Sequence, residues 1–370
     1  MKMIPVRLGI QQRVLPSYRT DFFDRLAAQC QNGCSVFAGM ARREEMLSKG
    51  ELKIAQYTLA TNIHIMSGRY YLCWQKGLIH WLAGVDPDVV IMEGNPRYIH
   101  SMDGIRWLHQ HDKKAIGWGL GAPQKPHGGN NLVNMLKKKM LTSYDLMITY
   151  SNKGKEEYIK LGYPEEKIFV APNAVAAKPN KLPKRAQKRF ENEQPTILYV
   201  GRLQARKRID LLIEACARLK DELNPRLWIV GDGPVRDDLE KIASMQFPDV
   251  EFFGSVYGED LEKYFSASDL FVLPGTGGLA VQQAMAHALP VIVAEADGTQ
   301  VDLVKKNNGW NVEPGDLENL VDTIRTAMND PERLRQMGAE SYKIIRDEVN
   351  LDKMLSTFIN AISTALEGSL

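Results

Sequence analysis

The chain has 370 residues, of which 44% are hydrophobic and 25% charged, with a formal net charge of +2 at pH 7. These values are those of an ordinary folded protein and exclude disordered and collagen-like chains. The length fits two domains. No apolar run approaches the roughly 18 residues of a membrane-spanning helix, and no apolar segment typical of a secretory signal precedes Arg13. We therefore expect a cytoplasmic protein.

Charge is unevenly distributed along the chain. Residues 1–173 carry 23 Lys and Arg against 15 Asp and Glu, whereas the remaining residues carry 24 against 30. The basic excess indicates an anionic surface or acceptor for the first half, but its cations are too interspersed with acids to predict nucleic-acid binding. The four cysteines are too few and too scattered for a disulfide framework, and they lack the ligand pairs of a metal site; they are Cys30, Cys34, Cys73 and Cys216.

Short apolar runs alternate with helical patterns from end to end. Six strands are expected in the first half, at 6–10, 34–39, 88–93, 114–119, 145–150 and 167–173. Six more are expected in the second half, at 196–201, 226–231, 250–254, 270–275, 290–295 and 309–314. Near-continuous apolar strands separated by helices are typical of parallel sheets covered on both faces. The fold class is therefore α/β, with two doubly wound Rossmann-like domains whose ligands bind at the carboxyl ends of the strands.

A stretch rich in Pro, Lys and Arg, 174–194, separates the two series of strands and is expected to be a linker. It divides the chain into an N-terminal domain, 1–173, and a C-terminal domain, 195–350. The last segment, 351–370, has the apolar spacing of a helix that closes a domain, and the N-terminal domain is the candidate.

A run of cations follows the first strand of the C-terminal domain. The turn after Gly201 carries Arg202, and a predicted helix begins directly behind Arg206, Lys207 and Arg208. Cations at a helix N-terminus are disfavoured by about 0.3–1 kcal/mol each, because this end of the helix dipole is positive. A bound phosphate or diphosphate would resolve the conflict. The alternative is a solvated run of surface charge.

At this point the sequence resembles a known family, the retaining family-4 glycosyltransferases, which have the GT-B fold. The segments that match its C-terminal domain in order and spacing are GRLQARK (201–207), IVGDGP (229–234), VEFFGSV (250–256) and SDLFVLP (268–274). The resemblance covers about residues 195–345, is weaker over 149–175, and is only general before that. It implies two Rossmann-like domains facing across a cleft, a nucleoside-diphosphate sugar as donor, and no metal or other cofactor.

The resemblance also implies roles for individual residues. Arg202 and Lys207 stand where the family's cations neutralise the departing diphosphate, on the turn that begins at Gly201. Because the charge on that group grows as the sugar–phosphate bond breaks, such contacts stabilise the transition state more than the ground state. The base would meet the backbone near Gly254, Ser255 and Val256.

Both glutamates of the family's E-x7-E motif are missing here. The one that holds sugar hydroxyls falls on Gly275, and the one that binds the ribose diol falls on Gln283. Gln can still bond both hydroxyls of a diol, without charge assistance. At Gly275, either the donor lacks the hydroxyl normally read, as a deoxysugar does, or backbone N–H groups read it, from Thr276, Gly277, Gly278 and Leu279. His287, on the same helix face as Gln283, is expected to be a packed core histidine.

The same stretch also fits a second motif. Gly275, Gly277 and Ala280, with Glu295 farther on, match the G-x-G-x-x-G/A fingerprint of dinucleotide sites. The match lies about 80 residues into its domain, whereas such a fingerprint normally opens the domain. It keeps a nicotinamide-dependent oxidoreductase as an alternative.

The N-terminal domain offers three sets of candidates. Arg19 opens an amphipathic helix and could reach the donor phosphates, with an exposed helix-end charge as the equal alternative. Glu93 and Asn95 follow a strand and could orient an acceptor hydroxyl, with a structural carboxylate as the alternative for Glu93. In the family a histidine often follows the middle strand near the reacting sugar, and His127 is the nearest histidine here.

Residues 130–145 predict a basic amphipathic helix, with Leu132, Leu136 and Met140 on one stripe beside Lys137–Lys139. Such helices can lie on anionic membrane surfaces, although a core-packed helix with a solvated face is more common. A peripheral location on the inner face of the membrane would suit a lipid-linked acceptor or a role in polysaccharide biosynthesis.

The sequence thus predicts a retaining glycosyltransferase that moves a hexose or deoxysugar from a nucleoside diphosphate to a glycan, lipid-linked or small-molecule acceptor. Two alternatives stay open: the oxidoreductase, and a family member that binds a nucleotide or a partner without turnover.

Overall fold

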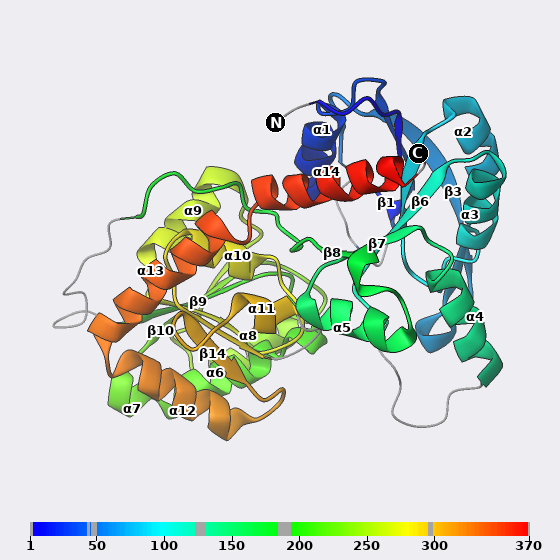
Figure 1. Cartoon of the computed structure of the whole chain (residues 1–370). Coiled ribbons are helices and arrows are strands. Elements are labelled where there is room, and N and C mark those ends of the chain that lie inside the picture. The colour runs from blue at the N-terminus through cyan, green and yellow to red at the C-terminus, as the bar shows by residue number, and fades with distance from the viewer. Residues whose placement is uncertain are drawn as a thin grey trace. The chain divides into compact units, whose positions relative to one another are not determined.

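The computed structural model describes residues 3–42, 45, 50–122, 131–183, 194–294 and 299–368. The chain forms two compact units (Figure 1). Unit 1 comprises Met1–Asn173 and Asp352–Leu370, and unit 2 comprises Ala174–Leu351. The first unit is therefore built from two separate stretches of the chain.

Unit 1 contains one eight-stranded sheet in the order β4-β3-β2-β1-β5-β6-β7-β8. Its strands are β1 (Leu8–Val14), β2 (Cys34–Gly39), β3 (Gln56–Ile65), β4 (Leu72–Lys76), β5 (Val89–Glu93), β6 (Lys114–Gly119), β7 (Leu146–Thr149) and β8 (Ile168–Val170). All neighbours pair in parallel except β3 and β4, which form an antiparallel edge. Strands β3 and β4 were not predicted from the sequence, and the first predicted strand ends four residues before β1 does.

The helices of unit 1 are α1 (Thr20–Ala27), α2 (Leu78–Val85), α3 (Ser101–Gln110), α4 (Asn131–Leu141), α5 (Asn152–Leu161) and α14 (Leu351–Glu367), with short 3-10 helices η1 (Ser17–Arg19), η3 (Gly68–Tyr70) and η4 (Glu165–Lys167). Helices α2 to α5 share one buried cluster with the sheet, to which they contribute Leu82, Ile105, Met140 and Tyr158. Helix α14 packs beside α1 (Figure 1), where the Phe358 ring lies 4.9 Å from Phe22 and 5.0 Å from Trp118 of β6.

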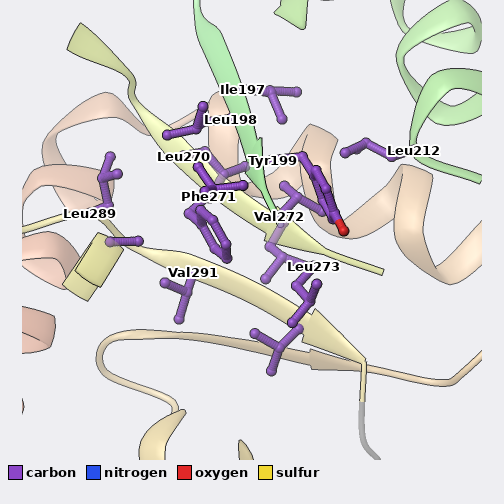
Figure 2. Close-up of a cluster of buried hydrophobic side chains, with 14 of the residues drawn as sticks. Ile197, Leu198, Tyr199, Leu212, Leu270, Phe271, Val272, Leu273, Leu289 and Val291 are labelled. Atoms are coloured by element: carbon purple, nitrogen blue, oxygen red, sulfur yellow. The ribbon is translucent and has the colours of Figure 1, made fainter. Parts of the chain in front are cut away.

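Unit 2 contains a six-stranded, fully parallel sheet in the order β11-β10-β9-β12-β13-β14. Its strands are β9 (Thr196–Val200), β10 (Arg226–Val230), β11 (Glu251–Gly254), β12 (Leu270–Leu273), β13 (Val291–Ala294) and β14 (Gly309–Val312). Figure 2 shows the buried side chains of β12 between those of its neighbours, Ile197–Tyr199 of β9 and Val291 of β13. This two-sided burial is why these strands have continuous apolar sequences.

The helices of unit 2 are α6 (Ile209–Arg218), α7 (Lys220–Leu223), α8 (Arg236–Gln246), α9 (Gly258–Ala267), α10 (Ala280–Ala286), α11 (Thr299–Leu303), α12 (Leu317–Met328) and α13 (Pro331–Asp347), with the 3-10 helix η5 (Ala205–Lys207). A buried ion pair fastens α13 to the sheet, because Arg335 donates to the carboxylate of Asp269, just before β12, at 2.8 Å.

The start of the expected linker is bonded to unit 2. The Val175 N–H donates to Gln282 of α10 at 3.0 Å, and the Tyr342 hydroxyl of α13 donates to the carbonyl of Pro179 at 3.2 Å. Among the residues that the structure describes, no helix is long and apolar enough to cross a membrane. The same residues contain no group of three or more His, Cys, Asp or Glu side chains that could hold a metal ion. All four cysteines are buried thiols.

Candidate functional site

The loops at the carboxyl ends of β9, β10 and β12 pack backbone against backbone. Gly231 has a φ of +145°, and a side chain there would collide with the carbonyl of Gly201. The N–H of Gly201 donates to Val230 at 3.0 Å, and that of Leu203 donates to Asp232 at 2.9 Å. Because these three strands are neighbours in the sheet, the sequence segments 201–208, 231–235 and 274–279 meet at one edge, where parallel sheets bind ligands.

Two of the cations after β9 hold the loop after β12. The Lys207 ammonium donates to the carbonyl of Thr276 at 2.7 Å and to the carbonyl of Gly277. The Arg206 guanidinium donates to the carbonyl and the hydroxyl of Thr276 at 3.3 and 3.2 Å. Lys207 is only 7% exposed. The solvated-charge alternative is therefore wrong for Lys207, whose charge is buried against polarised carbonyl groups.

Gly275 packs so closely against the backbone of Arg206 and Lys207 that it leaves no space for a side chain. A Cβ atom there would lie 2.5 Å from the carbonyl oxygen of Lys207 and nearer still to that of Arg206. The N–H of the next residue, Thr276, donates to Arg206 O at 3.0 Å and keeps the two loops together. A glutamate at position 275 has no room in this arrangement.

The other two cations of the run have different surroundings. Arg202 is half-buried, and its carbonyl accepts a hydrogen bond from the Tyr199 hydroxyl at 3.2 Å. Arg208 has a φ of +52° and donates from Nε and Nη2 to Asp210 at 3.0–3.2 Å. The charge of Arg208 is therefore paired with a carboxylate of the same chain.

Helix α10 presents Gln283 at its surface, whereas its neighbour Gln282 is buried and accepts from the N–H of Val175. His287 stacks on Phe265 at 5.2 Å, and its Nδ1 lies 2.9 Å from the carbonyl of Gln283. His287 is therefore packed against a neighbouring ring but is only half-buried, short of the core position expected.

At the end of β11, Gly254 adopts a φ of +68° and accepts from the N–H of Gly231 at 2.7 Å. Ser255 is exposed and Val256 half-buried. The backbone of this expected base-binding segment is thereby tied to the end of β10.

In unit 1, Glu93 ends β5 beside the end of β1. Its carboxylate accepts from the N–H of Arg13 at 2.5 Å, and its own N–H donates to Gln11 at 3.1 Å. Burial is the largest influence on the carboxyl group and raises its pKa to about 7. Asn95 closes a turn by accepting from the N–H of Arg97 at 3.1 Å.

A buried polar cluster lies beside Glu93 and was not predicted from the sequence. Gln11 donates to Gln75 at 2.5 Å, and His100, only 1% exposed, accepts from the N–H of Gln75 at 3.1 Å. Burial lowers the His100 pKa to about 4, so the ring is neutral near pH 7. A sequence signal that could have pointed to it is the pair Gln11-Gln12 directly after the first predicted strand, which lies within β1.

The remaining candidates are less favourably placed. Arg19 is only 4% exposed, so the exposed-charge alternative is wrong, and its guanidinium lies 5.2 Å over the Trp118 ring and 3.7 Å from the sulfur of Met354. His127 and Glu295 lie outside the described residues.

Comparison with known protein families gives a match over the region that contains this site. Residues 180–344, which include the cationic turn and the Gly275 loop, match the family described as "Glycosyl transferases group 1". This part of the chain is therefore similar to the group 1 glycosyl transferases. The dinucleotide motif lies inside the matched region, so the oxidoreductase alternative gains no support.

Curated relatives agree with this family. The chain is 34% identical over 155 residues to the sulfoquinovosyl transferase SQD2 of Arabidopsis thaliana, covering 40% of this chain and 29% of that protein. It is 24% identical over 303 residues to a GDP-mannose-dependent mannosyltransferase of Corynebacterium glutamicum, covering 77% and 76%. The matches span only 29%, 60% and 64% of the lengths of the first three relatives.

Solved structures establish the fold of the whole chain. HepE of Anabaena, in complex with UDP, superposes with a TM-score of 0.74 at 17% identity, covering 98% of this chain and all of that one. The lipopolysaccharide galactosyltransferase WaaB gives 0.71 at 17% identity over 97% and 99%. The expected GT-B fold is confirmed.

Proposed function

We propose that this protein is a retaining glycosyltransferase that uses a nucleoside-diphosphate sugar as donor. The observation that carries the proposal is the bonding of the buried Lys207 ammonium to the carbonyl groups of Thr276 and Gly277, inside the region matched by the family. It brings buried positive charge to the carboxyl edge of a parallel sheet, where nucleotides bind in such folds. Unit 2 is the donor-binding unit of this proposal.

In the proposed reaction, Arg202 and Lys207 offset the charge that develops on the departing diphosphate. Lys207 suits this role because its ammonium is fixed by carbonyl groups and is largely shielded from water. Electrostatic stabilisation is stronger in such a site than in water. Arg202 lies on the same turn, next to Gly201. For Arg19 to reach a phosphate, its guanidinium would have to leave Trp118 and Met354.

The donor's other contacts follow from the same edge of the sheet. The exposed side chain of Gln283 is the proposed ligand of the ribose diol, and the segment Gly254–Val256 is the proposed base site. Since Gly275 cannot carry a side chain in this packing, the backbone of Thr276–Leu279 is left to contact the sugar.

The acceptor is assigned to unit 1, with Glu93 and Asn95 near its hydroxyl. Helix α4 supports a peripheral site on an anionic membrane, because Met135 and Leu136 are 59% and 55% exposed beside the exposed Lys137–Lys139. Of the predicted stripe, Met140 is buried, Leu136 is exposed and the side chain of Leu132 lies outside the described residues. Sedimentation with phosphatidylglycerol and phosphatidylcholine vesicles tests this, and equal binding to both would remove the electrostatic argument.

The identity of the nucleotide that binds is the first property to determine. Solved structures of similar fold carry UDP or UDP-glucose, whereas curated relatives use GDP-mannose, so both bases need testing. The experiment is a thermal-shift screen with UDP, GDP, dTDP, ADP and NAD, in which a ligand at 100 times its Kd adds about 2.7 kcal/mol of stability. Donor cleavage is then followed with the sugar nucleotides of the base that binds.

The variant Lys207→Ala should abolish donor cleavage and weaken nucleotide binding. The matched control is Lys241→Ala on α8, whose side chain is 75% exposed, and it should behave like the unaltered protein. Stabilisation by NAD alone would refute the proposal. Nucleotide binding without cleavage of any donor or transfer to any acceptor would instead favour the non-catalytic family member.

A further inference from the structure

Arg206 is an exposed cation on the turn after β9, and its side chain is bonded to the loop that follows β12. Its Nη1 is bonded to both oxygens of Thr276, and its Nε donates to the side chain of Gln204 at 3.0 Å. In return, the carbonyl of Arg206 accepts from the N–H of Thr276 at 3.0 Å. The guanidinium is therefore held in position before any ligand binds, which lowers the entropic cost of using it in recognition.

No carboxylate among the described residues pairs with this guanidinium. Arg208, two residues later, is by contrast bonded through Nε and Nη2 to Asp210. The Nη2 group of Arg206 makes no hydrogen bond within the part of the chain that the structure describes. Two N–H donors of an exposed cation are thus available to a ligand.

The position that would normally balance this charge is closed. A side chain at Gly275 would collide with the backbone of Arg206 and Lys207, so the glutamate that the family resemblance places there has no space. A carboxylate accepts hydrogen bonds and reads hydroxyl groups, whereas a guanidinium only donates and prefers charged oxygens. The hydrogen-bonding character of the loop is therefore inverted from acceptor to donor.

We propose that the donor sugar carries an anionic substituent, a carboxylate or a sulfonate, and that Arg206 binds it. This inference rests on the proposed donor site in unit 2 and adds the class of sugar. In this proposal Arg202 and Lys207 neutralise the charge of the diphosphate, and Arg206 binds a further negative group on the sugar. A neutral deoxysugar offers no charged oxygen to the same guanidinium.

The test compares two donors that differ only in the oxidation of one carbon. Dissociation constants are measured by calorimetry for UDP-glucuronate and UDP-glucose, or for GDP-mannuronate and GDP-mannose if the nucleotide screen selects GDP. The uronate should bind at least about tenfold more tightly, the size of effect that one charge-assisted contact gives. In Arg206→Gln the two sugars should bind within about twofold of each other, while affinity for the nucleoside diphosphate alone is retained.

The control is Arg333→Gln on α13, another exposed arginine for which no ion pair is found among the described residues, and it should keep the preference for the uronate. Equal affinities of the unaltered protein for the two sugars would overturn the inference. So would an Arg206→Gln variant that loses affinity equally for both sugars and the free diphosphate, because Arg206 would then bind phosphate. Failure of the proposed function is seen separately, as the absence of binding by any nucleoside diphosphate.

Discussion

The contact between Gly275 and the cationic turn yields the most direct test of the site. In Gly275→Ala the new Cβ would lie 2.5 Å from the carbonyl oxygen of Lys207, whereas carbon atoms in contact keep about 3.5 Å from their neighbours. Because the obstructing atoms are backbone, the two loops must separate by about 1 Å. Such overpacking costs about 1–3 kcal/mol, and loss of the bond from Thr276 N–H to Arg206 adds about 1 kcal/mol.

The expected loss of stability is thus about 2–4 kcal/mol, or a fall in Tm of roughly 4–16 °C for a unit of this size. The assay is urea unfolding followed by hydrogen exchange of peptides from β9 and β12, which reports on unit 2 separately. The control is Gly84→Ala in α2, where a Cβ meets nothing within 4 Å, and there the same change should stabilise by about 0.5–1 kcal/mol. A Gly275→Ala protein that is as stable as the unaltered chain and binds nucleotide equally well would refute the steric reasoning.

Three further predictions concern buried charges. Since burial raises the Glu93 pKa from 4.5 to about 7, the folded state holds a proton that the unfolded state releases, so the free energy of unfolding should fall between pH 4.5 and 7 by up to about 3 kcal/mol. Glu93→Gln should remove that fall in urea titrations, and an advantage of the variant that is identical at pH 5 and pH 8 would contradict the assignment. His100 has the opposite sign: its pKa is lowered from 6.5 to about 4, so stability should drop by up to about 3 kcal/mol as the pH falls from 6.5 to 4, and His100→Gln should show a smaller acid loss in the same titration. Arg335→Met leaves the carboxylate of Asp269, which has no exposed surface, without its arginine and should cost about 3–5 kcal/mol, most of it recovered in the double variant with Asp269→Asn; a single variant within 1 kcal/mol of the unaltered protein by thermal denaturation would count against this pairing.

Twelve strands could be located from the sequence, and most of them have buried apolar runs, because two-sided burial in a parallel sheet leaves a continuous signal. Strands β3 and β4 escaped for the opposite reason. Leu59, Ile63 and Ile65 of β3 lie on an exposed face, so the alternation of apolar and polar residues does not match burial. An antiparallel edge with an apolar outer face carries no pattern that separates it from a loop.

At the site, the charge run after β9 predicted an anion-binding turn, but its partners depended on the fold. That Arg206 and Lys207 bond Thr276 and Gly277, about 70 residues away, follows from the adjacency of β9 and β12, which no local pattern reveals. The same holds for the cluster of Gln11, Gln75 and His100. Each of these residues is ordinary by itself, and only the pairing of distant strands makes it a buried hydrogen-bonding group.

The discontinuity of unit 1 has a consequence for how the protein is made. Helix α14 completes the aromatic cluster of Phe22 and Trp118 by adding Phe358, yet it is synthesised only after all of unit 2. Unit 1 therefore lacks one wall of its core until the whole of unit 2 has been synthesised. During that interval the rings of Phe22 and Trp118 lack their contacts with Phe358, and transiently exposed apolar surface of this kind favours aggregation.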